Sequence, residues 1–430
     1  MGYGDLLVNA GYLAVAGLSL LAMLAITVVS KSRWLEGAAG IVCSALLLMI
    51  HATNFSVAWL NIERLLPTVL FLGFCLSFAQ LCEKEKLFEY LGDFIGRQSR
   101  GNSKVLFVLV FALSAVVTSV LSLDATVLLL TPIVLQAASR LGIDHRPFAY
   151  ATGHLANTAS MLLPISNLTN LLLIAYGNIS FISFIRLSWL PWIVALAAEF
   201  LVLFIIFHKS LNSKRNISNR PQENPLATAH PPMFAIAVVA LTLIGFIVTG
   251  IVDIPPFWVA MSGCIILMLR RIRSKKSGIS EELRVTWKAF NISFLIFVLS
   301  LSVVIAVLSS NGLNVLLLPL FHQPVSLDSL LLIAAVSVMA SNVMNNLPAA
   351  MLLLPLAASQ SPIMAMAVLI GVNIGPNLTY VGSLANILWR RILLRRGNQV
   401  ELLQFSWIGL ITTFSCIISS ILALWISAAM

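Results

Sequence analysis

The sequence predicts an all-α polytopic membrane protein of two inverted-topology repeats, with about 10 transmembrane helices, two re-entrant helical hairpins and two broken helices. Composition is the first indication, because 59% of the 430 residues are hydrophobic, only 10% are charged and mean hydropathy is +0.98. The second is the presence of uncharged runs of about 20 residues, which suffice to cross a hydrocarbon core of about 30 Å. The third is a polar segment that divides the chain into two halves of similar layout.

Apolar runs between polar breakers predict the individual spans. Two longer runs, 105–139 and 327–357, have polar breaks near their middle at 122–126 and 341–348. We expect each to form a hairpin that enters and leaves on one side; two cramped spans are the alternative. The remaining predicted spans are 6–29, 36–53, 65–82, 147–175, 187–208, 232–251, 256–270, 289–310, 362–389 and 404–428.

Basic residues predict the orientation, because Lys and Arg accumulate in cytoplasmic loops. With both hairpins and an external N-terminus, 24 of the 26 Lys and Arg residues fall on one side. Both termini are therefore expected outside a bacterial inner membrane, with the lipid bilayer rather than nucleic acid as partner of this basic chain. The predicted cytoplasmic segments are 30–35, 83–104, 140–146, 209–231, 270–288 and 390–403. Within them, 82–104 is either an amphipathic interfacial helix or a solvated connector.

The ends and the cysteines add little chemistry. The first run lacks a basic n-region and carries Asp5, which favours a retained span over a cleaved signal. The five cysteines show no metal-ligand spacing, so we expect small core residues and no metal site.

Internal similarity supports the repeat. The Asn-, Pro- and Lys-rich segment 210–231 is expected to be a cytoplasmic linker between an N-terminal repeat, 1–209, and a C-terminal repeat, 232–430. The stretch NTASMLLPISNLTNLL (157–172) placed over NIGPNLTYVGSLANIL (373–388) pairs Asn157 with Asn373. In both halves this stretch follows the hairpin, as part of the predicted broken helices 147–175 and 362–389.

Polar side chains gather at these breaks. An unpaired amide or hydroxyl at membrane depth is costly, so such clusters should face protein or a water-filled cavity. We predict a central substrate site there, with helix–helix hydrogen bonding as the alternative role. The predicted substrate-binding residues are Asn345, Asn346, Asn373, Pro376, Asn377, Thr379, Ser383, Asn157, Ser160, Ser166 and Asn167.

The second hairpin and its broken helix follow helix-end chemistry. Asn346 is a good cap and Pro348 suits a first turn, so a helix should begin there with free N–H groups near the membrane centre. Gly375 and Pro376 should break the later helix by loosening the backbone and removing a donor.

Two titratable residues are candidates for the coupling ion. Asp124 is the only carboxylate that we place deep in an apolar run, which favours a proton or cation site; a helix cap is the alternative. His154 is either a proton relay or a structural histidine.

The motifs resemble those of the arsenical pump membrane protein family, within the ion transporter superfamily that includes sodium/proton antiporters and dicarboxylate transporters. SNVMNNLPAAMLLLPL (341–356) and GVNIGPNLTYVGSLANILW (371–389) carry the resemblance; DATVLLLTPIVL (124–135) and ANTASMLLPISNLTN (156–170) match more loosely. The family usually has Asn where this chain has Leu123, and often acids at Asn157 and Asn373. These departures either argue against proton coupling or move it onto Asp124, with His154 as a further candidate.

The resemblance implies a secondary active transporter that exports arsenite or antimonite, coupled to proton entry by alternating access. A dicarboxylate or other anion transporter and a sodium/proton antiporter are the alternatives, with protons or sodium as coupling ion. No nucleophile–base pair or nucleotide-binding loop is present in the sequence, so neither an enzyme nor a cofactor is expected. A soluble ATPase subunit and a second copy of the chain stay open as partners.

Overall fold

The computed structural model describes residues 3–29, 33–177, 179–212, 231–252, 254–274, 278–397 and 401–429. Every regular element in this part of the chain is a helix, and eight helical stretches are long and apolar enough to span a membrane. Shorter apolar helices of 10–17 residues accompany them. The predicted class, an all-α polytopic membrane protein, is confirmed. Most of the predicted linker 210–231 lies outside the described residues, and the inverted relation of the two halves stays a prediction.

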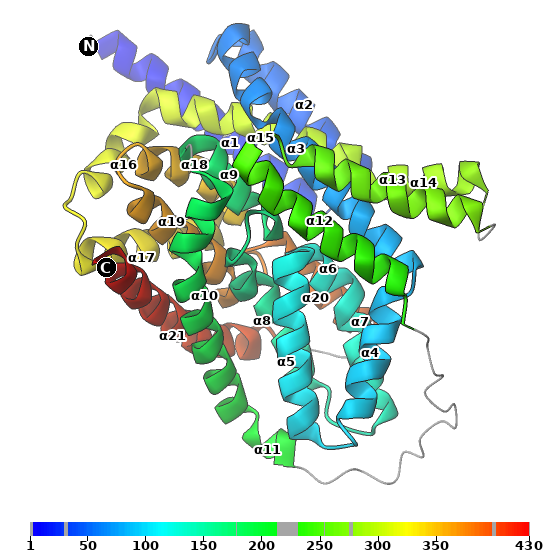
Figure 1. Ribbon diagram of the computed structural model, residues 1–430. Coiled ribbons are helices and arrows are strands. Elements are labelled where there is room, and N and C mark those ends of the chain that lie inside the picture. Colours follow the sequence, from blue (N-terminus) through cyan, green and yellow to red (C-terminus); the bar gives the residue numbers. More distant parts are fainter. Residues whose placement is uncertain are drawn as a thin grey trace.

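The first half begins with long helices and then breaks up around short ones (Figure 1). Helix α3 has 30 residues and begins ten residues before the predicted span, because it continues through Glu63 and Arg64. The helices are α1 (Tyr3–Val29), α2 (Arg33–Met49), α3 (Phe55–Lys84), α4 (Leu87–Gln98), α5 (Ser103–Val120), α6 (Leu123–Ala125), α7 (Thr131–Arg140), α8 (Arg146–Thr158), α9 (Leu168–Gly177), α10 (Phe181–Ile206) and α11 (His208–Asn212). A π-helix, Thr126–Leu130, joins α6 to α7.

The second half ends on α21, which has 28 residues. Residues 279–290 form a helix where the sequence predicted part of a cytoplasmic segment. The helices are α12 (Met233–Val252), α13 (Phe257–Arg273), α14 (Ile279–Phe290), α15 (Ile292–Leu308), α16 (Asn314–Phe321), α17 (Leu327–Met344), α18 (Asn346–Ala358), α19 (Pro362–Ile374), α20 (Leu384–Arg395) and α21 (Leu402–Ala429).

Packing brings distant segments of the chain together. Helix α2 packs on α15, α3 on α13, and α10 on α21, so each of these contacts joins the two halves. Helices α17, α18 and α19 pack on one another, and α9 of the first half lies against α18 and α19. At one of these contacts, a Cβ on Gly371 of α19 would stand 2.6 Å from the carbonyl oxygen of Ala334 on α17. Only glycine permits this approach.

The apolar interior is divided into two clusters of buried side chains. One includes Leu301, Leu353 and Ile370, and the other includes Phe107, Tyr150 and Trp389. Helices α3, α10 and α21 contribute to both clusters at different heights along their length. The polar breaks at 159–167 and 375–383 lie where the chain passes between these clusters.

Both predicted hairpin runs turn at their polar segments. Helix α5 ends at Val120, and a new helical stretch begins at Leu123. Helix α17 ends at Met344, and α18 begins two residues later after Asn345, whose φ is +75°. The predicted broken helices also break, at 159–167 and 375–383, as short 3-10 turns.

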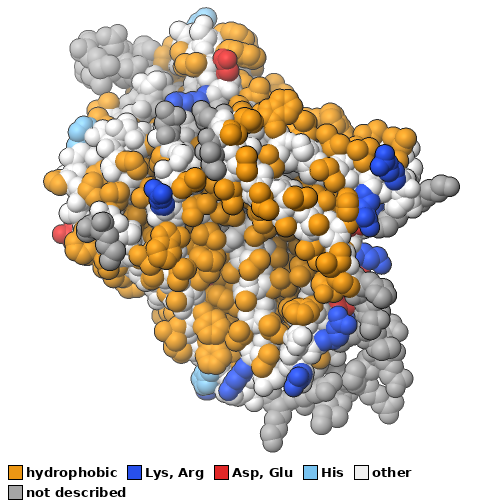
Figure 2. Space-filling model, viewed as in Figure 1, with side chains coloured by type: hydrophobic (Ala, Val, Ile, Leu, Met, Phe, Trp, Pro, Cys, Tyr) orange, Lys and Arg blue, Asp and Glu red, His pale blue; other side chains and the backbone are white. Residues whose placement is uncertain are grey.

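The surface carries a broad apolar face. Figure 2 shows hydrophobic side chains over most of this face, with most of the visible Lys and Arg side chains along its right and lower edges. One basic residue is instead buried: Arg271 of α13 contacts Glu85 Oε1 at 3.1 Å and Glu282 Oε1 at 2.8 Å. This ion network fastens α13 and α14 to the chain just after α3. Helix α4, in the predicted interfacial segment, packs on α3, α5 and α7 and buries Phe88 and Ile95.

Candidate functional site

A cavity of about 60 Å³ lies where the hairpin turns and the broken helices meet. One wall is apolar and includes Phe71 and Leu72 of α3 and Phe294 of α15. The other wall comes from the four polar breaks, two in each half of the chain. Its polar side chains are Ser122, Asp124, Ser166, Asn167, Thr169, Asn345, Asn346 and Ser383. Five predicted substrate-binding residues and Asp124 are therefore brought together.

Four helical stretches begin at this cavity. Ser122 caps the stretch that starts at Leu123, and Ser383 caps α20, with Oγ accepting from Asn386 N–H at 3.2 Å. Asn167 precedes α9 and accepts from Thr169 N–H at 3.3 Å, and Asn345 precedes α18. The N-terminal end of a helix carries partial positive charge and free N–H groups. The wall therefore offers donors and a positive potential without a cationic side chain.

The turn of the second hairpin differs from the prediction. The capping residue is Asn345 rather than Asn346, and its side chain makes no capping bond. Instead, Asn345 Nδ2 donates to the carbonyl of Val381 at 3.3 Å, and Asn346 N–H donates to the carbonyl of Gly382 at 3.0 Å. These bonds tie the hairpin turn to the break before α20, so the two elements form one wall.

Asp124 lies in this wall as a carboxylate without a protein partner. In the described part of the chain no hydrogen bond or ion pair reaches its side chain, and Ser122 rather than Asp124 caps the helical stretch, by accepting from Ala125 N–H. The alternative role of Asp124 as a cap is therefore wrong. An unpaired acid at membrane depth is costly, which makes it available for a ligand or proton.

The other predicted substrate-binding residues lie outside the cavity wall, in a buried hydrogen-bond network. Asn373 Nδ2 donates to Asn170 Oδ1 at 2.9 Å, and its own Oδ1 accepts from Thr169 Oγ1 at 2.6 Å and Asn167 Nδ2 at 3.2 Å. This node joins α19 to the start of α9. Asn167 also donates to Ser160 Oγ at 3.1 Å, so one face of the network touches the cavity.

A second node lies around Asn157. Its Nδ2 donates to Asn377 Oδ1 and to Asn386 Oδ1, both at 2.8 Å. Asn377 Nδ2 donates in turn to Thr158 Oγ1 at 3.0 Å. For Asn157, Ser160, Asn373 and Asn377 the structure thus shows helix–helix hydrogen bonding, the alternative role. Pro376 and Thr379 are also outside the wall: Pro376 and Thr379 accept from Asn386 through their carbonyls, and Thr379 Oγ1 donates to Asn342 at 2.8 Å.

Glu199 is the functional candidate that the sequence analysis missed. It lies in α10, is fully buried, and its Oε1 is 2.9 Å from His154 Nδ1. The statement that Asp124 is the only deep carboxylate is therefore wrong. The sequence signal for Glu199 is a single acid in the apolar run of α10. Like Asp124, it is a carboxylate deep in an apolar run, which is costly unless it is used or paired. His154 itself belongs to α8, lies away from the cavity wall and contacts α10 and α21.

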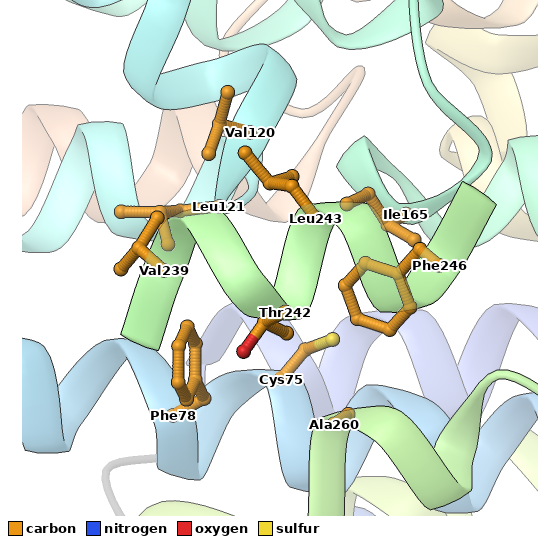
Figure 3. A pocket seen from close by; sticks show the side chains of 10 residues that line it. All are labelled: Cys75, Phe78, Val120, Leu121, Ile165, Val239, Thr242, Leu243, Phe246 and Ala260. Carbon is orange, nitrogen blue, oxygen red and sulfur yellow. The ribbon is translucent and has the colours of Figure 1, made fainter. Parts of the chain in front are cut away.

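A second, much smaller pocket of about 10 Å³ lies beside the cavity (Figure 3). Its lining is apolar apart from Cys75 and Thr242, and the Thr242 hydroxyl donates to Val238 O. Figure 3 shows Phe78, Phe246 and Leu243 among the side chains around it. Cys75 lines both spaces. The small pocket has room for about one water molecule and so holds no substrate.

The apolar helices, the polar breaks and the central cavity together define a polytopic membrane transporter. Residues 10–364 match the model of the citrate transporter family, and the chain belongs to this family.

Individual relatives are named more narrowly. The arsenical pump membrane protein of Yersinia enterocolitica is 26% identical over 403 residues, covering 89% of this chain and 91% of that protein. That of Escherichia coli strain K12 is 26% identical over 401 residues, 87% of this chain and 89% of that protein. The solved structure of the Alcanivorax borkumensis YdaH transporter shares the fold, with a TM-score of 0.60 at 14% identity over 87% of this chain and 88% of that one. The predicted resemblance, and the prediction of a transporter rather than an enzyme, are confirmed.

Proposed function

We propose that this chain exports arsenite and antimonite in exchange for entering protons. The chemistry of the cavity wall carries the proposal: its polar groups are carboxamides, hydroxyls, helix N–H groups and one carboxylate, with no Lys, Arg or His. Neutral arsenite has three hydroxyls, which donate to carboxylate and carboxamide oxygens and accept from N–H groups. The volume of about 60 Å³ corresponds to roughly four to six water-sized molecules, which suits a four-atom solute. The names of the curated relatives support the same substrate.

An organic anion such as citrate is the second candidate. The four helix starts favour it, because helix N-termini attract negative charge. Against it stand the carboxylate of Asp124 and the absence of a cationic side chain among the residues that line the cavity. A tricarboxylate is also larger than this space. We therefore place the metalloid first.

Asp124 is the proposed site of proton coupling. As a carboxylate it accepts a hydrogen bond from an arsenite hydroxyl, and a proton arriving from outside converts it to a donor and weakens that contact. Alternating access would let the proton enter from outside and leave to the cytoplasm, after the metalloid has left in the opposite direction. Asparagine at this position keeps an acceptor oxygen and loses the titration.

Everted membrane vesicles from an efflux-deficient bacterium test the proposal. An acidic interior should drive arsenite accumulation by the wild-type chain, and Asp124→Asn should bind arsenite but lose this proton-driven accumulation. Asp328→Asn, at an exposed acid in the first turn of α17, is the matched control and should behave as wild type. If a sodium gradient rather than a pH gradient drives accumulation, the coupling ion is sodium and not the proton. Citrate uptake with unchanged arsenite sensitivity of the cells would transfer the assignment to the organic anion.

A further inference from the structure

The pair of His154 and Glu199 is a buried acid–base site that the cavity mechanism does not use. Both side chains are fully buried, on α8 and α10. Glu199 Oε2 accepts from Thr158 Oγ1 at 3.0 Å and from Cys416 Sγ of α21 at 3.2 Å. Thr412 Oγ1 of α21 lies 3.2 Å from His154 Nδ1. Three helices from both halves of the chain thus meet at one carboxyl group.

Proton count alone sets the charge of this pair. No Lys or Arg forms an ion pair with Glu199 in the described part of the chain. The pair has two titratable neighbours among the described residues. Tyr150 lies on α8 like His154, and the centroids of their rings are 5.6 Å apart; Cys416 donates to Glu199. Asp124 belongs to α6, which packs on α8, but lies in the cavity wall. One shared proton leaves the pair neutral, and the loss of that proton leaves one negative charge in the membrane interior.

A vacant position for a proton is visible on the histidine. Nε2 of His154 is buried and has no hydrogen-bond partner, although buried polar atoms are normally paired. When Nδ1–H donates to Glu199, Nε2 presents a lone pair to a space without a donor. The pair can therefore take a proton on Nε2 without displacing another contact, whereas a proton on the carboxyl group changes the contacts of Glu199.

The pair is also joined to the cavity through consecutive hydrogen bonds. Thr158 donates to Glu199 and accepts from Asn377 Nδ2 at 3.0 Å. Asn157 connects Asn377 to Asn386, whose N–H donates to the cap Ser383 in the cavity wall. If Oε2 carries a proton, Thr158 receives two donors, and its own hydroxyl proton has to find another acceptor. A change of proton count thus alters the bond next to Asn377.

We propose that His154 and Glu199 form a second proton-binding site whose occupancy is linked to that of the cavity. This inference rests on the proposed proton-driven export and adds a second titrating group to it. Arsenite binding at the cavity releases a proton from this pair as well as from Asp124. Glu199 is a positioning and proton-binding residue here, without contact to substrate.

Infrared spectroscopy of the purified full-length protein tests the pair without substrate. As pH is lowered, the wild type should gain the carbonyl stretching band of a protonated carboxylic acid, and Glu199→Gln should lose one component that Asp124→Asn retains. Cys416→Ala removes one donor to Glu199, so it should move the pH midpoint of that component while leaving the Asp124 component unchanged. This variant decides the question if Glu199→Gln fails to fold. If neither substitution changed any pH-dependent band, either of a protonated carboxylic acid or of the His154 imidazole ring, the proposal would be overturned.

Arsenite binding in two buffers of different ionisation enthalpy then tests the link. Calorimetry should show one proton fewer released per arsenite for Glu199→Gln than for the wild type, with Asp328→Asn as control. Equal proton release in both would refute the link. If the wild type binds no arsenite but the Glu199 component titrates, the proposed substrate fails and the proton site stands. Arsenite export without a titrating Glu199 component would have the opposite meaning.

Discussion

Truncation of Asn373 and truncation of Asn346 should affect different properties of the protein, although the sequence predicted the same role for both residues. Asn373 makes three side-chain hydrogen bonds in the buried network, to Asn170, Thr169 and Asn167. Asn346 lines the cavity, and in the described chain its side chain makes no hydrogen bond, while its backbone N–H donates to the carbonyl of Gly382. We therefore expect Asn373→Ala to lower stability and Asn346→Ala to lower affinity for arsenite.

The magnitudes follow from the bonds lost. Hydrogen bonds between membrane helices contribute about 0.6 kcal/mol each on average, so three bonds amount to about 2 kcal/mol. Asn170 Oδ1 keeps no side-chain donor after the substitution, and a buried unsatisfied group adds about 1–3 kcal/mol. The free energy of unfolding of Asn373→Ala should thus fall by about 3–5 kcal/mol. Asn346→Ala loses about 1 kcal/mol of binding, roughly a fivefold weaker Kd, with a nearly unchanged unfolding transition.

The assay is thermal unfolding of both purified variants, followed by calorimetric titration with arsenite below the unfolding transition. Unfolding should begin at a lower temperature for Asn373→Ala, whereas its Kd should stay close to that of the wild type. Wild-type stability of Asn373→Ala together with a large loss of arsenite affinity would refute the division into wall and network. It would restore Asn373 as a ligand-binding residue.

Two further predictions concern packing and orientation. Gly371→Ala forces a Cβ against the backbone of α17 and should cost about 1–3 kcal/mol, whereas Gly17→Ala meets no atom within 4 Å and should be neutral or slightly stabilising; equal unfolding temperatures would contradict this packing. In a cysteine-free background, an impermeant thiol reagent applied to intact cells should label Gln323→Cys and not Ser280→Cys, because the basic residues predict opposite sides. Labelling of the second alone would reverse the orientation.

Periodicity and turn chemistry predicted the interruptions of the helices better than their ends. The chain turns at the polar segments 122–126 and 341–348, because Ser122 caps a new helical stretch just after the end of α5 and Asn345 lies between α17 and α18. The charged residues Glu63 and Arg64 precede the predicted span 65–82, yet both lie inside α3, so a charge in the sequence does not mark the end of this helix. Helix α14 lies mostly in the predicted cytoplasmic segment 270–288, where its four charged residues alternate with an apolar stripe that includes Trp287.

The sequence predicts which segments meet at the site, but not which of their side chains line the cavity. Asparagine at a helix break has the same sequence signal whether its carboxamide faces a cavity, as in Asn346, or another carboxamide, as in Asn373. The difference depends on which helices meet, and hence on contacts more than 200 residues apart in the chain, such as that between Asn157 and Asn377. Glu199 has a sequence signal of its own, a single acid in an apolar run, but its pairing with His154 depends on the contact between α8 and α10.

The buried network between the two apolar clusters is built largely from carboxamides and hydroxyls, and this has an electrical consequence. A membrane potential performs work of about 2.3 kcal/mol per elementary charge for each 100 mV crossed, and none on a neutral amide that moves. Among the described side chains of this region, voltage therefore acts on Asp124 and the Glu199 pair, and also on any ion that the cavity holds. If neutral arsenite leaves while a proton enters, each cycle carries positive charge inward. The transport rate should then rise with an inside-negative potential even when the pH is equal on both sides.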